Sequence, residues 1–236
     1  MEKILITGAN RGVGFEITRQ YLQAGNIHII ATCRNPDTAT ELQALAQQHP
    51  NHLDVVQLDI NDSKSIEASM QAVEGVVESL DVLINNAGIN PRGETHSRLS
   101  QLESDAIEHV ITTNAVAPLL VTQAYRHLLK KGNNPRVVMV SSQMGSLEWT
   151  RSGGSYAYRM SKAAMNMSVR TLASDSGMSG ITVVTTHPGW VRTDMGGSGA
   201  DISPQESASG LIKVISSLTS SDNGKFYKWN GEEHVW

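Results

Sequence analysis

Short apolar runs recur along this chain, and they constrain its fold more than any other feature. Val82–Ile84 and Val137–Val140 are apolar at every position, with no polar alternation. Strands of this kind are covered on both faces, as in parallel sheets flanked by helices. Six runs are predicted to be strands: Ile4–Thr7, Ile27–Thr32, Asp54–Leu58, Val82–Asn85, Arg136–Ser141 and Thr182–Thr186.

Segments with helical spacing lie between these runs. Val13–Gln23 and Ser63–Glu78 repeat apolar residues every three or four positions. Strands that alternate with helices are typical of βαβ units with right-handed crossovers. We therefore expect one α/β domain over residues 1–236, with a Rossmann-like, doubly wound parallel sheet of about seven strands and helices on both faces. Ligands of such folds bind beyond the carboxyl ends of the strands.

Composition excludes several classes of function. Nineteen Lys and Arg against 23 Asp and Glu give a net charge of −4, which argues against nucleic acid as a partner. One cysteine, Cys33, rules out an intramolecular disulfide framework and a Cys-rich zinc site. The sequence has no apolar stretch of about 18 residues and no signal-peptide pattern at Met1–Ile6. We expect a cytoplasmic protein that does not bind membranes or metals.

A glycine-rich loop follows the first predicted strand, in the sequence T-G-A-N-R-G-V-G. Glycines at these positions permit a tight turn, close approach of a pyrophosphate, and close packing of helix on strand. The helix that follows offers free N–H groups to the phosphates. The alternative is a plain turn into a helix. The residues expected to bind the nucleotide here are Gly8, Asn10, Arg11, Gly12, Val13 and Gly14.

Two arginines indicate which nucleotide the loop holds. NAD-binding folds place an acidic residue at the end of the second strand, for the ribose 2′-hydroxyl. Arg34 stands there instead, and Arg11 lies in the glycine-rich loop. Guanidinium groups can pair with a 2′-phosphate through charge-assisted hydrogen bonds. NADP(H) is therefore favoured over NAD(H), although both residues could also be solvated surface arginines.

Tyr158 and Lys162 stand four residues apart, ahead of a predicted helix over Ala163–Ala173. At this spacing both side chains lie on one helical face. A free phenol has a pKa of about 10, and a nearby ammonium group stabilises its phenolate. Tyr158 could then exchange a proton with an alcohol or carbonyl oxygen while hydride is transferred. The alternative is an exposed helical pair without a function.

Two further motifs complete a pattern. Asn85-Asn86-Ala87-Gly88 ends the fourth predicted strand, and Ser141-Ser142-Gln143-Met144-Gly145 ends the fifth. In this order, with the glycine-rich loop and the Tyr-x-x-x-Lys pair, they resemble the classical short-chain dehydrogenase/reductase family. The resemblance extends over essentially the whole chain.

The resemblance implies a role for four catalytic residues. Tyr158 would be the general acid/base, and Lys162 would lower its pKa and bind the nicotinamide ribose. Ser142 would polarise the substrate carbonyl, because the family serine precedes x-x-Gly and Gly145 follows at that spacing. Asn114 would hold a proton-relay water, although a helix N-cap is the simpler interpretation.

The resemblance also extends the cofactor site. Asp59 would contact the adenine, with Ile60 beside it, unless Asp59 caps a helix instead. Asn86, Ala87 and Gly88 would line the pocket. The segment after the sixth strand would lie beside the nicotinamide through Pro188, Gly189, Val191 and Thr193, whereas His187 is expected to be structural.

Two sequence stretches narrow the resemblance further. Ser155–Asn166 and the ending Gly224–Trp236, with a last strand and a turn at Asn230-Gly231, look like C-factor-like and sniffer-type carbonyl reductases. This implies an NADPH-dependent reductase of an aldehyde or ketone. The alternatives are a C-factor-type signalling protein with secondary turnover, and an NAD-linked alcohol dehydrogenase.

The substrate is expected to be a small carbonyl or alcohol compound. A glycine-rich segment, Met195–Ser203, is a candidate lid ahead of a helix that begins with Ser203-Pro204. Family members are usually homodimers or homotetramers, so we expect one of these assemblies. Candidate substrate-pocket residues are Asn90, Met144, Trp149, Trp190 and Met195, any of which could instead belong to the core or the surface.

Overall fold

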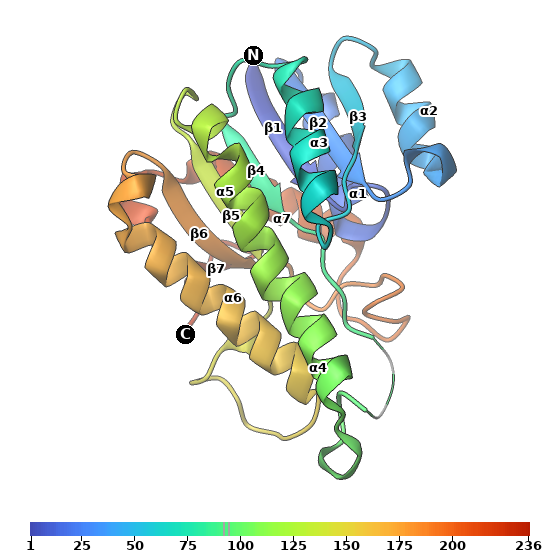
Figure 1. Ribbon diagram of the computed structural model, residues 1–236, viewed down its shortest axis with the longest axis vertical. Helices are drawn as coiled ribbons and strands as arrows, with labels where there is room; N and C mark the ends of the chain where they lie inside the picture. The colour runs from blue at the N-terminus through green and yellow to red at the C-terminus, as the bar shows by residue number, and fades with distance from the viewer. Residues whose placement is uncertain (92, 94) are drawn as a thin grey trace.

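The computed structural model describes residues 1–91, 93 and 95–236, and its centre is one parallel sheet (Figure 1). The sheet has seven strands in the order β3-β2-β1-β4-β5-β6-β7, and every neighbouring pair is parallel. The strands are β1 (Glu2–Thr7), β2 (Ile27–Cys33), β3 (Leu53–Gln57), β4 (Val82–Asn85), β5 (Arg136–Val140), β6 (Thr182–His187) and β7 (Phe226–Lys228). The predicted doubly wound, Rossmann-like α/β fold is confirmed.

The strand order reverses beside β1. From β1 the chain steps outward to β2 and β3, then returns to place β4 on the other side of β1. The connections that leave β1 and β4 therefore lead to helices on opposite faces of the sheet. In this fold class that point is where nucleotides bind.

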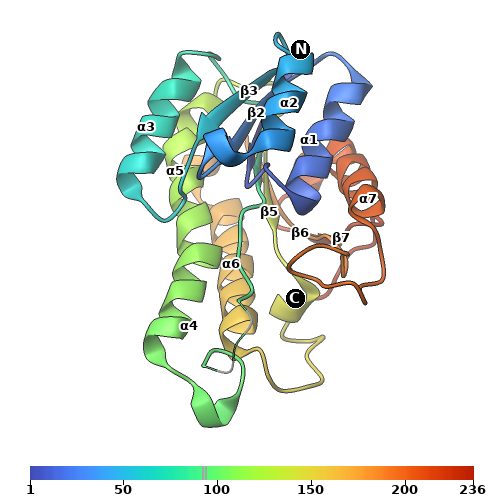
Figure 2. The ribbon, with the colours of Figure 1, turned by 90° about the vertical axis from the view of Figure 1, so that its right-hand side faces the viewer.

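The long helices cover both faces of the sheet. In Figure 2, α3, α4, α5 and α6 lie on one side of the sheet, and α1 and α7 pack together on the other. The helix bounds are α1 (Gly12–Ala24), α2 (Thr40–Gln48), α3 (Ser63–Glu74), α4 (Ser104–Ile111), α5 (Ala117–Leu129), α6 (Tyr156–Ser174) and α7 (Pro204–Ser217).

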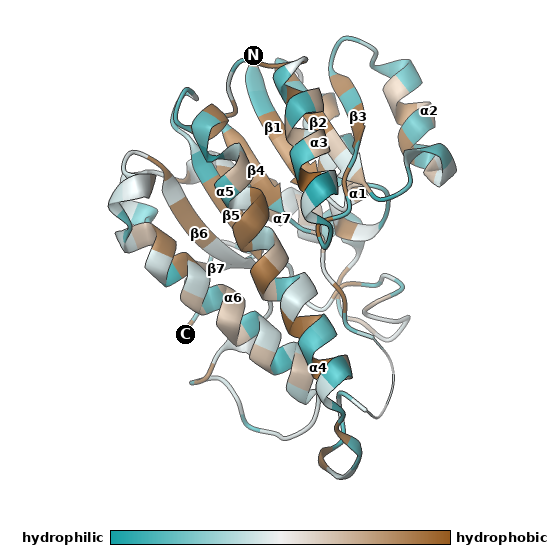
Figure 3. Ribbon diagram, viewed as in Figure 1, coloured by the Kyte–Doolittle hydropathy of each residue, from teal (hydrophilic) through white to brown (hydrophobic). Residues whose placement is uncertain are grey.

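Alternate residues of the buried strands enter different cores, which explains their lack of polar alternation. Ile4 and Ile6 of β1 pack with α1, α2 and α7, whereas Leu5 packs with α3, α5 and α6. All three side chains are fully buried. Figure 3 shows hydrophobic residues along the strands, while much of α2 and α3 is hydrophilic. Burial on both faces requires the apolar pattern that the sequence carries.

Some predicted boundaries differ from the structure. The helix predicted over Ser63–Glu78 ends at Glu74, because Gly75 follows and glycine disfavours helix continuation. Val77 is nevertheless buried among residues of α3 and α5. Among the described residues, no helix is long and apolar enough to cross a membrane.

Helix α6 and the last strand also correspond to predicted elements. The helix predicted over Ala163–Ala173 begins earlier, at Tyr156, so it also carries the Tyr-x-x-x-Lys pair. The predicted final strand and turn are present, since Gly231 N donates to Lys228 O at 3.0 Å and Tyr227 bridges to Glu233.

Candidate active site

The glycine-rich loop is closely packed at two of its glycines. Gly8 has φ of +66°, and a Cβ there would lie 3.0 Å from Ala87 Cα. A Cβ on Gly14 would lie 2.4 Å from both Gly8 O and Asn86 Nδ2. Gly14 thus permits the close helix–strand packing that the sequence predicts.

Asn86 ties the loop after β4 to the glycine-rich loop. Its Nδ2 donates to Thr7 O at 3.0 Å and to Gly8 O at 3.1 Å. The main-chain N–H groups of Asn86 and Ala87 both donate to Thr7 Oγ1 at 3.0 Å. These four hydrogen bonds therefore join the loops that leave β1 and β4 at the point where the strand order reverses.

Replacing Gly14 with Ala should destabilise the protein by disturbing the packing of these two loops. The added methyl group would enter space that Gly8 O and Asn86 Nδ2 occupy, and overpacking of this kind costs about 1–3 kcal/mol. Chemical denaturation should show the loss. Gly199→Ala is the matched control, because nothing lies within 4 Å of a Cβ there. Equal stability of the two variants would contradict the close packing.

The start of α1 can receive a negatively charged group. Among the described residues no side chain caps this helix, and its first turn has no acidic residue. The unpaired N–H groups of the first turn are therefore available to phosphate oxygens. Arg11 precedes the helix with a largely exposed side chain, and Arg34, just after β2, is exposed too. These residues fit a phosphorylated dinucleotide.

The structure places Tyr158 and Lys162 together on the buried face of α6. Tyr158 is 8% exposed and Lys162 is 4% exposed. Lys162 Nζ lies 5.8 Å from the centre of the Tyr158 ring and donates to Val140 O at 2.9 Å. The interpretation of this pair as an exposed helical pair is wrong.

Burial determines the protonation of both residues. It lowers the pKa of Lys162 to about 8, because the ammonium group loses its hydration. It raises the pKa of Tyr158, and a hydrogen bond with Ser142 only partly opposes that rise. The direction for Tyr158 differs from the expected lowering, because Lys162 Nζ is directed to the Val140 carbonyl and burial penalises the phenolate.

Ser142 and Asn114, the other two predicted catalytic residues, lie beside this pair. Ser142 follows β5, and its Oγ accepts a hydrogen bond from Met144 N at 3.1 Å. Asn114 lies in a π-helical turn, Thr112–Val116, between α4 and α5, so it is not a helix N-cap. A Cβ on Gly88 would lie 3.1 Å from Asn114 Oδ1 and 3.6 Å from Lys162 Nζ, so these groups meet at the end of β4.

The π turn directs Asn114 into the site, which is a frequent use of such turns. Asn114 Oδ1 accepts from Ile89 N, and its Nδ2 donates to Ile89 O, both at 2.8 Å. Nδ2 also reaches Ser161 Oγ at 3.0 Å, and Ser161 Oγ donates to Tyr158 O at 2.8 Å. Asn114 therefore links the loop after β4 to α6.

Two residues that the sequence analysis did not single out hold α6 in place. Ser161 makes the bonds just described, and Asn166 bridges α6 to the end of β5. Asn166 Oδ1 accepts from Ser141 Oγ at 2.8 Å, and its Nδ2 donates to Gly145 O at 3.1 Å. Their sequence signal is polarity on the buried face of α6, where Ser161, Lys162 and Asn166 are all buried.

The remaining predicted cofactor residues lie on loops at the carboxyl edge. Asp59 Oδ1 accepts from Asn61 N at 3.0 Å, whereas Asp62 caps α3, so the N-cap interpretation of Asp59 is wrong. The Ile60 side chain packs in the core. Pro188, Gly189, Val191 and Thr193 follow β6, and Gly189 has φ of +88°.

Predicted pocket residues differ in their surroundings. Trp149, Trp190 and Met195 are 40%, 50% and 46% exposed. The Trp149 ring meets the His234 ring edge-on at 6.5 Å. His187 is 7% exposed, and burial lowers its pKa to about 3, so it stays neutral as a structural residue would.

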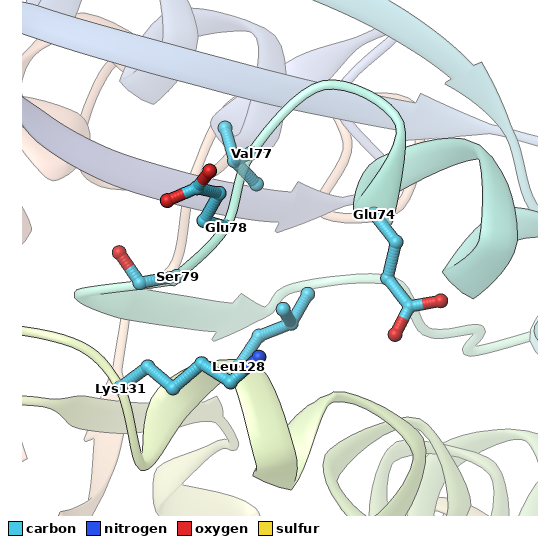
Figure 4. A pocket seen from close by; sticks show the side chains of 6 residues that line it. All are labelled: Glu74, Val77, Glu78, Ser79, Leu128 and Lys131. Carbon is cyan, nitrogen blue, oxygen red and sulfur yellow. The ribbon is translucent and has the colours of Figure 1, made fainter.

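A separate hollow lies at the opposite edge of the sheet. It has a volume of about 510 Å³ and is bounded by residues before β4 and at the end of α5 (Figure 4). Its lining is Glu74, Val77, Glu78, Ser79, Leu128 and Lys131. Because it lies at the amino ends of the strands, it is far from the groups described above. Among the described residues, no cluster of three or more His, Cys, Asp or Glu could hold a metal ion.

Comparisons with known proteins agree with this geometry. The family model for short chain dehydrogenase matches residues 2–201. C-signal of Myxococcus xanthus is 42% identical over 157 residues, which cover 66% of this chain and 93% of that protein. Two solved structures align with this whole chain. Carbonyl reductase Sniffer of D. melanogaster is 34% identical, and the alignment covers all of that chain with a TM-score of 0.93. The NADPH-bound carbonyl reductase from chicken fatty liver is 37% identical, and the alignment covers 99% of that chain with a TM-score of 0.91.

Proposed function

The chain belongs to the short-chain dehydrogenase family, and on that basis we propose that it is an NADPH-dependent reductase of a small aldehyde or ketone. One observation carries the proposal. Tyr158, Ser142, Lys162 and Asn114 converge beside the glycine-rich loop, at the carboxyl edge where the strand order reverses.

The cofactor is NADP(H). Arg11 and Arg34 are exposed near the start of α1 and the end of β2, where a 2′-phosphate would be recognised. Neighbours with related folds support this choice, since the chicken reductase is NADPH-bound and a reductase from Pseudomonas aeruginosa is in complex with NADP. The other proposed cofactor residues are Gly8, Asn10, Gly12, Val13, Gly14, Asp59, Ile60, Asn86, Ala87, Gly88, Tyr158, Lys162, Pro188, Gly189, Val191 and Thr193.

Each catalytic side chain has a definite task in this proposal. When bound, NADP(H) supplies the hydride for reduction. Ser142 orients and polarises the carbonyl oxygen, and Tyr158 donates a proton to that oxygen as the alcohol forms. Burial raises the pKa of Tyr158, which keeps the phenol protonated at neutral pH, the form that reduction requires.

Lys162 and Asn114 support this proton transfer. The Lys162 ammonium stabilises the phenolate that remains after the proton leaves Tyr158. Its pKa of about 8 leaves it mostly charged at neutral pH. Asn114 holds the loop after β4 and α6 in register, and we propose that it also holds the water through which the proton is replaced.

Similarity to C-signal favours a second candidate, a nucleotide-binding signalling protein in which turnover is secondary. The filled catalytic positions favour the reductase. An NAD-linked alcohol dehydrogenase is the other alternative, but an arginine replaces the acidic residue that such a protein would carry near the end of β2. The homodimer or homotetramer and the cytoplasmic location stay predictions.

Titration with NADPH and NADH, followed by a panel of aldehydes and ketones at saturating cofactor, tests the proposed function. We expect tighter binding of NADPH, with turnover of at least one carbonyl class. Selective NADPH binding without turnover would favour the signalling candidate. Tighter binding of NADH would overturn the assignment of the two arginines.

Replacing Arg34 with Asp should shift the preference toward NADH. The carboxylate would repel a 2′-phosphate and could accept a hydrogen bond from a ribose 2′-hydroxyl. We expect NADPH affinity to fall about 10-fold or more, since a charge-assisted hydrogen bond contributes about 1.5–3 kcal/mol. Parallel titrations of both nucleotides measure the shift. Arg98→Asp gives the same charge change at another residue, and an unchanged preference in Arg34→Asp would remove that residue from the phosphate site.

A further inference from the structure

Arg11 of the glycine-rich loop is already engaged by a carboxylate in this structure. Its Nη1 lies 3.0 Å from Asp194 Oδ2, in the segment between β6 and α7. The Thr193 side chain also lies close to the glycine-rich loop, because a Cβ on Gly12 would lie 3.4 Å from Thr193 Cγ2. Figure 2 shows this orange segment beside the lower end of α1. The ion pair thus joins the phosphate-binding loop to the segment on the substrate side.

Hydrogen bonds within that segment join its beginning to its end. Val191 bridges to Ile202, Arg192 N donates to Ile202 O at 2.9 Å, and Ile202 N donates to Trp190 O at 3.1 Å. Gly197 N donates to Thr193 O at 2.8 Å. None of these bonds involves the glycine-rich loop, so opening of the Arg11–Asp194 pair loosens the attachment of the segment to that loop and allows its own hydrogen bonds to open more often. We call residues 190–202 the β6–α7 flap.

We propose that Asp194 competes with the cofactor 2′-phosphate for Arg11, and is therefore a cofactor-selectivity residue that latches the β6–α7 flap. The inference rests on the proposed function, because it takes Arg11 as a ligand of that phosphate. A phosphate monoester is dianionic or nearly so at neutral pH and offers three acceptor oxygens, whereas the carboxylate carries one charge. The phosphate therefore binds the Arg11 guanidinium in preference to the carboxylate. The Arg11–Asp194 ion pair opens when a 2′-phosphorylated dinucleotide binds. A dinucleotide with a free 2′-hydroxyl leaves the pair closed.

The exposure of the pair sets the size of the effect. The Arg11 and Asp194 side chains are 70% and 84% exposed, so water and salt screen their attraction. Exposed pairs of this kind change an equilibrium constant by about 1.5- to 5-fold. NADPH must break this ion pair in order to bind, which weakens its binding, whereas NADH leaves the pair intact. Asp194 lowers the selectivity for NADPH by that factor.

Replacing Asp194 with Asn tests this competition. We expect NADPH to bind about 1.5- to 5-fold tighter and NADH to bind unchanged, measured by calorimetric titration of both nucleotides. In an Arg11→Leu background the gain from Asp194→Asn should vanish, because the guanidinium that the two anions share is absent. This double-mutant comparison isolates the pair from other interactions of Asp194.

Asp201→Asn is the matched control for charge. It removes an exposed carboxylate from the same flap, and Arg11 has its ion pair with Asp194 instead. Equal gains for Asp194→Asn and Asp201→Asn would mean that net charge alone acts, and would overturn the proposal. So would an unchanged or weaker affinity of Asp194→Asn for NADPH.

Hydrogen exchange gives a second readout that does not depend on catalysis. Without nucleotide, amides of residues 193–200 should exchange faster in Asp194→Asn than in the wild type, because the latch is open; equal exchange would overturn the latch. Failure of the wild-type protein to bind NADPH would overturn the proposed function and this inference together. NADPH binding that Asp194→Asn leaves unaltered would overturn this inference alone.

Discussion

Tyr158→Phe should lower kcat for carbonyl reduction by about 10²- to 10⁴-fold while NADPH binding stays within about twofold. A fall in kcat of this size is typical when the side chain that transfers a proton in the transition state is removed. Phe keeps the ring that is buried beside Lys162 and removes only the hydroxyl that we propose as the proton donor. Steady-state kinetics with a responsive carbonyl, together with NADPH titration, measure the two effects.

Tyr156→Phe is the matched control for this loss. Tyr156 begins the same helix and loses the same hydroxyl group, but unlike Tyr158 it is not among the buried residues. Its kcat should remain close to that of the wild type. If Tyr158→Phe kept more than about a tenth of wild-type kcat, Tyr158 would not be the proton donor.

The raised pKa of Tyr158 gives this experiment a pH signature. Reduction uses the protonated phenol, so its rate should be steady at neutral pH and fall as the pH rises through the pKa of Tyr158. Alcohol oxidation uses the phenolate, so its rate should rise over the same range. Because burial places that pKa above its ordinary value in the free protein, both changes belong in the alkaline range.

Lys162→Met should abolish most activity and at the same time stabilise the fold. Loss of the ammonium group removes the charge that we propose to stabilise the Tyr158 phenolate, for an expected fall in kcat of at least about 100-fold. The same ammonium group is 4% exposed, and burial lowers its pKa from 10.5 to about 8. A shift of this size is a penalty of order 3 kcal/mol at neutral pH, so an apolar isostere should raise the free energy of unfolding by about 1–3 kcal/mol.

The stability gain should depend on pH with a definite sign. Between about pH 8 and 10.5 the unfolded chain keeps a proton on Lys162 that the folded protein has released. The unfolded state then binds more protons, so wild-type stability rises with pH relative to the variant. The advantage of Lys162→Met should be full below about pH 8 and shrink towards pH 10.5.

Urea denaturation at several pH values measures this difference. Lys213→Met is the control, because Lys213 lies exposed on α7 and has no buried charge to relieve. A loss of stability in Lys162→Met at neutral pH would contradict the account, since it would mean that the bond from Lys162 Nζ to Val140 O outweighs the cost of burying the charge.

Local patterns in the sequence predicted the fold class. Apolar runs such as Val82–Ile84 specify strands that are buried on both faces, and helical spacing between them specifies the crossovers. The glycine-rich loop and the Tyr158–Lys162 spacing are also local, because each lies within a single turn or helix. These features can be predicted from the sequence because they depend only on residues that are close together in the chain. The end of α3 at Glu74 was missed, since apolar spacing continues through Val77 after the helix has stopped.

Only the tertiary structure decided the environment of the site. Burial fixes the direction of the pKa shifts of Tyr158 and Lys162, and burial depends on what packs around them from other elements. The contacts of Asn114 and Asn166 span at least one strand or helix, and the Arg11–Asp194 pair joins residues 183 positions apart. The residue types are readable from the sequence, but desolvation and long-range pairing depend on distances that only the folded chain sets.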